Sequence, residues 1–383
     1  MFKASCFAAL AVAALASAGH VQADQPLKAD VVHWWTSGGE AAALKVIADA
    51  YTRAGGQWVD SAVAGDAAAR AAGINRIVGG NPPTMMQFNT GKQLDDLLGN
   101  GLLDNLDDAA AAGKWRDILP QPIIDASTRG GHVYALPINI HSAGWVWYNA
   151  KVFSDAGVEP PKNWSDVVAV APALEAKGII PLAHGGQAWQ DKLLFDAILA
   201  QEGGRELYLG VYGTEPETAL ADPKFKHVAE LFKSMRGLMD DGSPGRNWND
   251  ATALVITGKA AMQLMGDWAK GEFLAAGRMP GKDLGCVIPG DAVYLMGGDV
   301  FVFPKLSDEN GKAAQRKLED LLLSPEVQVA FNAKKGSIPV RTDVDTSQMD
   351  ACAQKGGPSN SPARTISCQP TRPVRSKTLS PST

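Results

Sequence analysis

The chain alternates short apolar segments with Ala-rich, helix-like ones, and this alternation is the feature that most restricts its fold. Residues 29–35 have strand character, residues 36–39 (Thr-Ser-Gly-Gly) form a turn, and residues 40–54 have helical character. The same order returns as a helical segment at 66–78, a strand at 84–88 and a helix at 92–98. Strands that alternate with helices predict an α/β fold, in which ligand-binding loops follow the strands.

The length of the chain and its later strands predict two lobes. A chain of 383 residues is too long for one small core. Strand-like residues 133–138 and 144–148 place the first crossing between lobes, and the strand at 296–303 places the second. The expected division is residues 24–138 and 297–352 for the first lobe, 139–296 for the second and 353–383 for a tail.

The first 23 residues have the composition of a secretory signal peptide. Lys3 precedes an apolar run at residues 7–18, and the small-residue site Val21-Gln22-Ala23 follows. A membrane anchor is the alternative, but it needs about 20 apolar residues, and Gly19 and His20 interrupt this run. We therefore expect cleavage after Ala23 and export to the periplasm.

Three cysteines remain once Cys6 leaves with the signal peptide, so only one disulfide can form within a monomer. Cys286 and Cys352 are the expected pair, because both precede the tail, and Cys368 is expected to stay free. The cysteines are widely separated and the six histidines are dispersed. A structural metal site is not expected.

Two tryptophans and a glutamate stand around the first Gly-rich turn. A sugar offers an apolar C–H face and polar hydroxyls, so its sites combine aromatic rings with charged groups. Trp34, Trp35 and Glu40 supply both kinds of group, and glycine in the turn lets the backbone approach a ligand. The alternative is that one ring packs in the core, since side chains alternate along a strand.

Trp248 and Trp268 are further candidates for ligand contact. Both lie beside polar residues, in the segments Arg-Asn-Trp-Asn-Asp and Gly-Asp-Trp, rather than in apolar periodic stretches. Such loop positions at strand ends often carry function, although either ring could simply cover the edge of a core. Trp145 and Trp147 share one face of a strand, which favours core packing or the floor of a pocket.

Few enzyme signatures are present. The chain has no Gly-x-Ser-x-Gly elbow, His-Glu-x-x-His motif, phosphate-binding loop or dinucleotide fingerprint. A net charge of -5, with no basic stripe, argues against nucleic acid as a partner. The acidic pairs at 95–96, 107–108 and 240–241 leave a secreted glycoside hydrolase as the alternative function, although such pairs usually lie on solvated faces.

Five motifs spread over most of the mature chain resemble one protein family. They are residues 32–40 (VHWWTSGGE), 80–84 (GNPPT), 137–141 (PINIH) with 147–149 (WYN), 265–268 (MGDW) and 335–341 (KGSIPVR). These motifs are similar to those of the monosaccharide-specific extracellular solute-binding proteins, which are the glucose- and mannose-binding subunits of ABC importers.

The resemblance implies a type II-like periplasmic binding protein, with two α/β lobes, hinge strands and a ligand cleft between the lobes. It implies no catalysis and no cofactor, and a monomer that passes a monosaccharide such as glucose to an inner-membrane permease. It also implies a set of sugar-contacting residues. They are the stacking rings Trp34 and Trp35, the second-lobe rings Trp248 and Trp268, and the hydroxyl-binding Glu40, Lys92, Asp299 and Lys335.

The end of the chain departs from the family pattern. Residues 355–383 contain five basic side chains, no acid and many Ser, Pro and Thr residues. Such a segment buries too little apolar surface to offset its ordering entropy, so a disordered or aberrant tail is expected. The resemblance implies further helices and a ligand-contacting histidine at this point. Without them we expect an exposed patch on the second lobe, weak sugar binding and aggregation.

Overall fold

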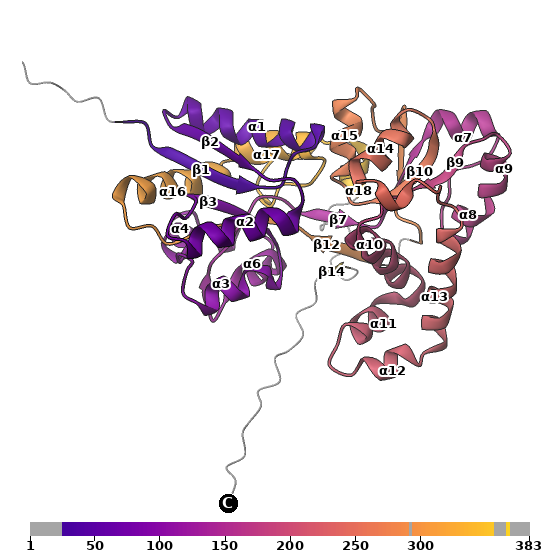
Figure 1. Ribbon diagram of the computed structural model, residues 1–383, viewed down its shortest axis with the longest axis horizontal. Helices are drawn as coiled ribbons and strands as arrows, with labels where there is room; N and C mark the ends of the chain where they lie inside the picture. Colours follow the sequence, from indigo (N-terminus) through magenta and orange to yellow (C-terminus); the bar gives the residue numbers. More distant parts are fainter. Residues whose placement is uncertain (1–24, 291–292, 356–364, 368–383) are drawn as a thin grey trace, which may run out of the picture.

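The computed structural model describes residues 25–290, 293–355 and 365–367, and they form two lobes side by side (Figure 1). The predicted signal peptide, its cleavage site after Ala23, Cys368 and most of the predicted tail lie outside these residues. None of the helices in the described ranges is long and apolar enough to span a membrane.

The first lobe is built on a five-stranded sheet with the order β2-β1-β3-β13-β6. Its strands are β1 (Lys28–His33), β2 (Gln57–Ala62), β3 (Met85–Asn89), β6 (Leu136–Pro137) and β13 (Asp299–Val302). β1 pairs in parallel with β2 and β3, whereas β13 runs antiparallel to β3 and β6. The lobe is therefore made from two segments of the chain that are far apart in sequence.

Helices cover both faces of this sheet, because residues that alternate along β1 point to opposite sides. Val31 packs in the core beneath α1, α16 and α17, and Val32 packs in a second core beneath α2 and α3 (Figure 1). The helices are α1 (Gly38–Arg53), α2 (Asp66–Val78), η1 (Lys92–Leu94), α3 (Asp95–Gly99), α4 (Asp107–Ala112), α5 (Trp115–Ile118), α6 (Gln121–Ser127), α16 (Glu309–Leu322) and α17 (Pro325–Lys335), with a small hairpin of β4 (Thr128–Arg129) and β5 (His132–Val133).

The second lobe has a four-stranded sheet with the order β11-β8-β10-β9, surrounded by helices. The strands are β8 (Trp145–Asn149), β9 (Ile180–Ala183), β10 (Ala260–Met265) and β11 (Leu284–Val287). The helices are α7 (Ala150–Ala156), α8 (Trp164–Ala169), α9 (Ala171–Glu175), α10 (Ala188–Ile198), the π-helix η2 (Leu199–Gly203), α11 (Gly204–Val211), α12 (Pro216–Leu220), α13 (Pro223–Arg236), η3 (Ser243–Gly245), α14 (Trp248–Ile256), α15 (Ala269–Ala275) and α18 (Ala351–Lys355).

A small sheet lies between the lobes. It consists of β7 (His141–Ala143), β12 (Tyr294–Gly297) and β14 (Thr365–Ser367), in the order β14-β12-β7. The chain passes from the first sheet to the second through β7 and returns through β12 (Figure 1). The expected α/β architecture with two lobes and connecting strands is therefore confirmed.

Two parts of the predicted tail, which was expected to be disordered or aberrant, have regular secondary structure. Residues 353–355 belong to α18, and β14 pairs in parallel with β12, with Tyr294 opposite Thr365. The expectation from composition considered only the apolar surface that the tail could bury by itself. It did not predict that β12 would offer backbone hydrogen-bonding groups to a later strand.

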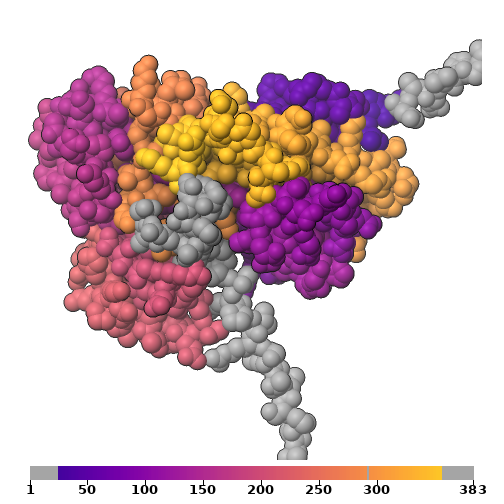
Figure 2. All heavy atoms as spheres, turned by 180° about the vertical axis from the view of Figure 1, so that it is seen from behind, coloured from indigo at the N-terminus to yellow at the C-terminus, as the bar shows by residue number. Residues whose placement is uncertain are grey.

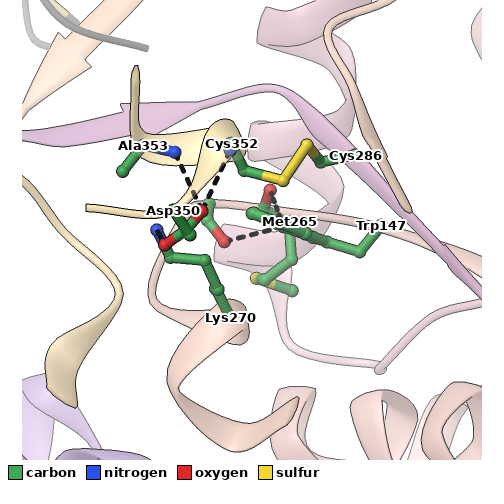
Figure 3. The surroundings of a disulfide bond; sticks show 8 residues. Trp147, Met265, Lys270, Cys286, Asp350, Cys352 and Ala353 are labelled. Atoms are coloured by element: carbon green, nitrogen blue, oxygen red, sulfur yellow. Dashed lines mark hydrogen bonds and ion pairs between the residues drawn. A yellow bond between two sulfur atoms is a disulfide. The ribbon is translucent and has the colours of Figure 1, made fainter. Parts of the chain in front are cut away.

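The predicted disulfide between Cys286 and Cys352 is confirmed, and their Cα atoms are 6.1 Å apart (Figure 3). Beside it, the nearly buried ammonium group of Lys270 lies 2.7 Å from the Asp350 carboxylate, which also accepts a 2.9 Å hydrogen bond from the Cys352 amide. Cys352 thus packs in the core of the second lobe, although the predicted boundary at residue 352 assigns it to the first. The predicted division would have made the disulfide a link between the two lobes, whereas both cysteines pack in the same core of the second lobe.

The segment after α17 consequently makes a third connection between the lobes. Ile338 pairs with Ile140 of the first crossing, and Thr342 donates a backbone hydrogen bond to Ile118 in the first lobe. Seen from behind, this late part of the chain lies across both lobes (Figure 2). The disulfide therefore anchors a segment that the first lobe also holds.

Candidate functional site

A cavity of about 660 Å³ lies between the two lobes. Its first-lobe lining comes from the β1–α1 turn, the β2–α2 loop, the end of β3, the start of β13 and the end of α17. Its second-lobe lining comes from the starts of α10 and α14 and from the segment before α15. Six of the predicted site residues line it: Trp34, Glu40, Trp248, Trp268, Asp299 and Lys335.

The two adjacent tryptophans follow β1 and differ in their surroundings, although both contact the core of the first lobe. Trp34 is partly buried and lines the cavity. Trp35 is 1% exposed and packs against Phe301 and Phe331, with ring centroids 5.7 and 5.3 Å away. The structure therefore places Trp35, which the resemblance implies as a stacking ring, in the core of the first lobe.

Lys92 is the other predicted residue outside the cavity lining. It is exposed at the start of η1, whereas Asn89, three residues earlier, lines the cavity. Gly91 turns the chain between them with a φ of 111°, a conformation that favours glycine. The prediction chose the charged residue of this segment, and the cavity wall is formed by the amide residue at the strand end.

Glu40 and Lys335 form a buried ion pair where two helix ends meet. Glu40 lies in the first turn of α1 and Lys335 in the last turn of α17, positions where the helix dipoles favour these charges. Lys335 Nζ lies 2.9 Å from Glu40 Oε1, and Ser37 Oγ donates to Glu40 Oε2 at 3.0 Å. Burial alone would lower the pKa of Lys335, but the carboxylates of Glu40 and Asp299 outweigh burial and raise it.

Asp299 is held by three side-chain donors. Gln87 Nε2 donates to Oδ1 at 2.9 Å, and Asn139 Nδ2 and His141 Nε2 each lie 2.8 Å from Oδ2. Burial would raise the pKa of this carboxyl group, but the charge and hydrogen bond of His141 dominate and lower it to about 2. Asp299 is therefore a fixed anion at the floor of the cavity.

His141 lines the cavity but was not among the predicted site residues. Its ring also contacts a second aspartate, with Nδ1 2.5 Å from Asp267 Oδ1. Burial would lower its pKa, but Asp267 and Asp299 together raise the pKa to about 9. The position of His141 after a predicted strand was the available signal, although it does not specify two partners more than 120 residues away.

Aromatic rings form the second-lobe side of the cavity. The Trp268 ring is 5.1 Å from the His141 ring in an edge-on arrangement, and it covers Gly266, where a Cβ would lie only 2.1 Å from it. Trp248 begins α14, and Trp189, in the first turn of α10, lies 6.3 Å from Trp268. Trp189 was not predicted, although it stands beside Gln187 and Gln190, as Trp248 stands beside polar residues.

The remaining sequence candidates do not enter the cavity. Trp145 and Trp147 are buried and stack on each other at 5.5 Å, which agrees with core packing. The three acidic pairs lie elsewhere and contribute surface ion pairs: Asp95 with Arg129, Asp107 with His132 and Asp240 with Arg246. No cluster of three or more metal-binding side chains occurs in the described parts of the chain.

Glu40 and Asp299, two of the carboxylates that line the cavity, do not suit the acid role in glycoside hydrolysis. A hydrolase needs one carboxyl group that stays protonated near neutral pH so that it can act as the acid. Glu40 is paired with Lys335, and Asp299 has a lowered pKa beside His141. The arrangement is suited to hydrogen bonding with hydroxyl groups rather than to proton transfer.

A family model described as bacterial extracellular solute-binding protein matches residues 35–329. The chain belongs to this family. Among its relatives is a probable sugar-binding periplasmic protein of Brucella suis, 39% identical over 360 residues, which cover 93% of this chain and 85% of the relative. A probable sugar-binding periplasmic protein of Rhizobium meliloti is 40% identical over 331 residues, covering 85% of this chain and 79% of the relative.

Solved structures support the same fold. A chitin oligosaccharide binding protein has a TM-score of 0.75 at 20% identity, with 90% of each chain covered. The bacterial solute receptor AcbH has a TM-score of 0.73 at 20% identity, covering 90% of this chain and 87% of AcbH. At this identity the likeness concerns the fold alone. The family and the named relatives identify the chain as a sugar-binding component of an ABC importer.

Proposed function

We propose that the protein binds a monosaccharide, with D-glucose as the first candidate, in the cavity between its lobes and catalyses no reaction. The observation that carries this proposal is the composition of the cavity. Tryptophan rings and a buried set of charges face the same space from opposite lobes. This is the combination that a sugar ring with its hydroxyl groups requires.

The polar groups have hydrogen-bonding capacity left for a ligand. An ammonium group has three donors, and the structure gives Lys335 Nζ one hydrogen-bond acceptor among the described residues, Glu40. Each oxygen of Glu40 accepts one such bond, from Lys335 or Ser37, so each has a lone pair for a hydroxyl donor. Lys335 would donate to sugar oxygens and Glu40 would accept from sugar hydroxyls.

The names of relatives and similar structures include both monosaccharides and oligosaccharides, and they define the alternatives to be tested. AcbH is described as preferring β-D-galactopyranose, and a relative from Haloferax volcanii, 26% identical, is a xylose/arabinose-binding protein. Other similar structures are described with maltose or raffinose. The ligand screen below therefore includes disaccharides.

Delivery to a permease follows from the family. The relatives are named periplasmic proteins, and we propose export through the signal peptide, cleavage after Ala23 and action as a monomer. A sugar that contacts both lobes stabilises the closed form and so shifts the population towards it. The closed form would be the state that the inner-membrane permease recognises.

The test is isothermal titration calorimetry of the mature protein with D-glucose, D-mannose, D-galactose, D-xylose, maltose and raffinose. We expect one-to-one binding that is strongest for a monosaccharide. Tightest binding of maltose or raffinose would overturn the monosaccharide assignment. New reducing ends after incubation with glucosides would overturn the binding-only function in favour of a glycoside hydrolase.

A further inference from the structure

His141 lies between two aspartates that come from different lobes. Asp299 begins β13 in the first-lobe sheet, and Asp267 follows β10 in the second-lobe sheet. Their carboxylate oxygens lie 2.8 Å from Nε2 and 2.5 Å from Nδ1 of the same ring. His141 itself lies on β7, the first crossing between the lobes.

The geometry determines the charge of the ring. A neutral imidazole has one N–H donor and one acceptor nitrogen, whereas an ionised carboxylate only accepts. Two such bonds to ionised carboxylates therefore require an imidazolium, which donates from both nitrogens. Asn139 Nδ2 also lies 3.1 Å from Nε2, but it is closer to Asp299 Oδ2, at 2.8 Å, and we assign its hydrogen bond to that carboxylate. The raised pKa of His141, about 9, agrees with this charge near neutral pH.

The same contacts leave Asp299 little freedom. A carboxylate has about four acceptor positions, and three of those on Asp299 are taken by Gln87, Asn139 and His141. About one position is left for a sugar hydroxyl. Asp267 is fixed in turn, because its Oδ2 accepts the Ser142 amide at 2.9 Å.

We propose that His141 is a positioning residue that fixes Asp299 towards a single sugar hydroxyl and so lets the site distinguish epimers. This inference rests on the proposed function, since it assumes that a monosaccharide occupies the cavity. Epimers differ in the direction of one hydroxyl group. A carboxylate with one available acceptor position can distinguish these hydroxyl directions only if the carboxylate itself is held in one orientation.

The charges around His141 explain why sugar affinity should depend on the protonation of its ring. Asp299 faces it from β13, Asp267 from the end of β10, and Lys335, paired with Glu40, approaches both aspartates from the end of α17. Within this group, loss of the His141 proton leaves three carboxylates and one ammonium. Sugar affinity should therefore stay level from pH 6 to 8 and fall as the pH rises through 9.

The experiment compares the wild-type protein, His141→Gln and the matched control His132→Gln. His132 also pairs with an aspartate, at 2.6 Å, but on the surface. Affinities for D-glucose, D-mannose and D-galactose are measured by calorimetry from pH 6 to 10. For His141→Gln we expect about tenfold or greater loss of affinity for the preferred sugar. We also expect a smaller ratio between epimers and no fall in affinity around pH 9, while His132→Gln behaves as the wild type.

A ligand-free measurement separates this inference from the proposed function. Nitrogen chemical shifts of the His141 ring in the wild-type protein should show both nitrogens protonated at pH 7. A neutral ring at pH 7 would overturn the inference, whether or not sugar binds. An unchanged epimer ratio and pH profile in a folded His141→Gln protein would also overturn it. Absence of binding by the wild type to every sugar would instead overturn the proposed function.

Discussion

The two walls of the cleft differ in how firmly their side chains are held. On the first-lobe side, Glu40, Asp299 and Lys335 are at most 7% exposed and are fixed by hydrogen bonds and ion pairs. On the second-lobe side, Trp189 is 36% exposed and Trp248 is partly buried. Fixed polar groups lose little freedom on binding, so the first lobe should determine which hydroxyls are accepted. The rings of the second lobe should add contact area when the cleft closes.

The largest expected effect follows from removing one charge of the fixed wall. Lys335→Met leaves the Glu40 carboxylate buried without its partner, and breaking such a pair costs about 3–5 kcal/mol of stability. The same change should weaken sugar binding about tenfold or more, because charge-assisted hydrogen bonds are lost. Chemical denaturation and calorimetry measure the two effects separately.

The double variant Glu40→Gln with Lys335→Met is the matched control. It removes both charges, so it should regain part of the stability lost by the single variant while sugar affinity stays low. Recovery of both quantities would show that Lys335 acts only in the structure. The first-lobe wall would then have no special part in ligand selection, and the proposed difference between the two walls of the cleft would be wrong.

Adjacent tryptophans allow the core and the cavity to be compared directly. Trp35→Ala should lower the free energy of unfolding by about 3–5 kcal/mol, because it empties a buried site between Phe301 and Phe331. Trp34→Ala should change stability much less and weaken sugar binding by about 0.5–1.5 kcal/mol beyond the lost contact area. If Trp34→Ala binds every sugar as the wild type does, the ring has no part in the site.

Removal of the disulfide tests how firmly the segment after α17 is anchored to the second lobe. The double variant Cys286→Ser with Cys352→Ser should lower the free energy of unfolding by about 2–4 kcal/mol. The hydrogen bonds and ion pairs that hold Glu40, Asp299 and Lys335 involve neither cysteine, so their contribution to sugar affinity should persist. Peptide mapping without reduction should find the Cys286–Cys352 peptide, and a Cys286–Cys368 peptide would contradict the pairing.

Much of the fold could be predicted because local periodicity determines it. The predicted helix at 66–78 coincides with α2, and the predicted helix at 40–54 corresponds to α1, which begins two residues earlier, at Gly38. The pairing of β14 with β12 could not be predicted in this way. It depends on backbone groups of a strand about 70 residues earlier, and nothing in the composition of residues 365–367 indicates that partner.

The candidate site was predictable where a residue type implies its own chemistry. Trp34 and Glu40 follow a strand end, and both line the cavity. The sequence could not determine which of Trp34 and Trp35 faces the cavity. Alternation along a strand predicts that neighbouring side chains point in opposite directions, but it does not identify the one that points into the core. The proposed role of His141 depends on its contacts with Asp267 and Asp299. Both aspartates are distant in sequence, so these contacts are visible only in the tertiary structure.

The most direct test of the account is a crystal structure of the mature protein grown with saturating D-glucose. The account predicts one sugar between the lobes, within hydrogen-bond distance of Glu40, Asp299 and Lys335, with its C–H face against Trp34, Trp248 or Trp268. Glucose bound outside this cavity, or a cavity without glucose at saturation, would contradict the claim that the two walls receive a single monosaccharide.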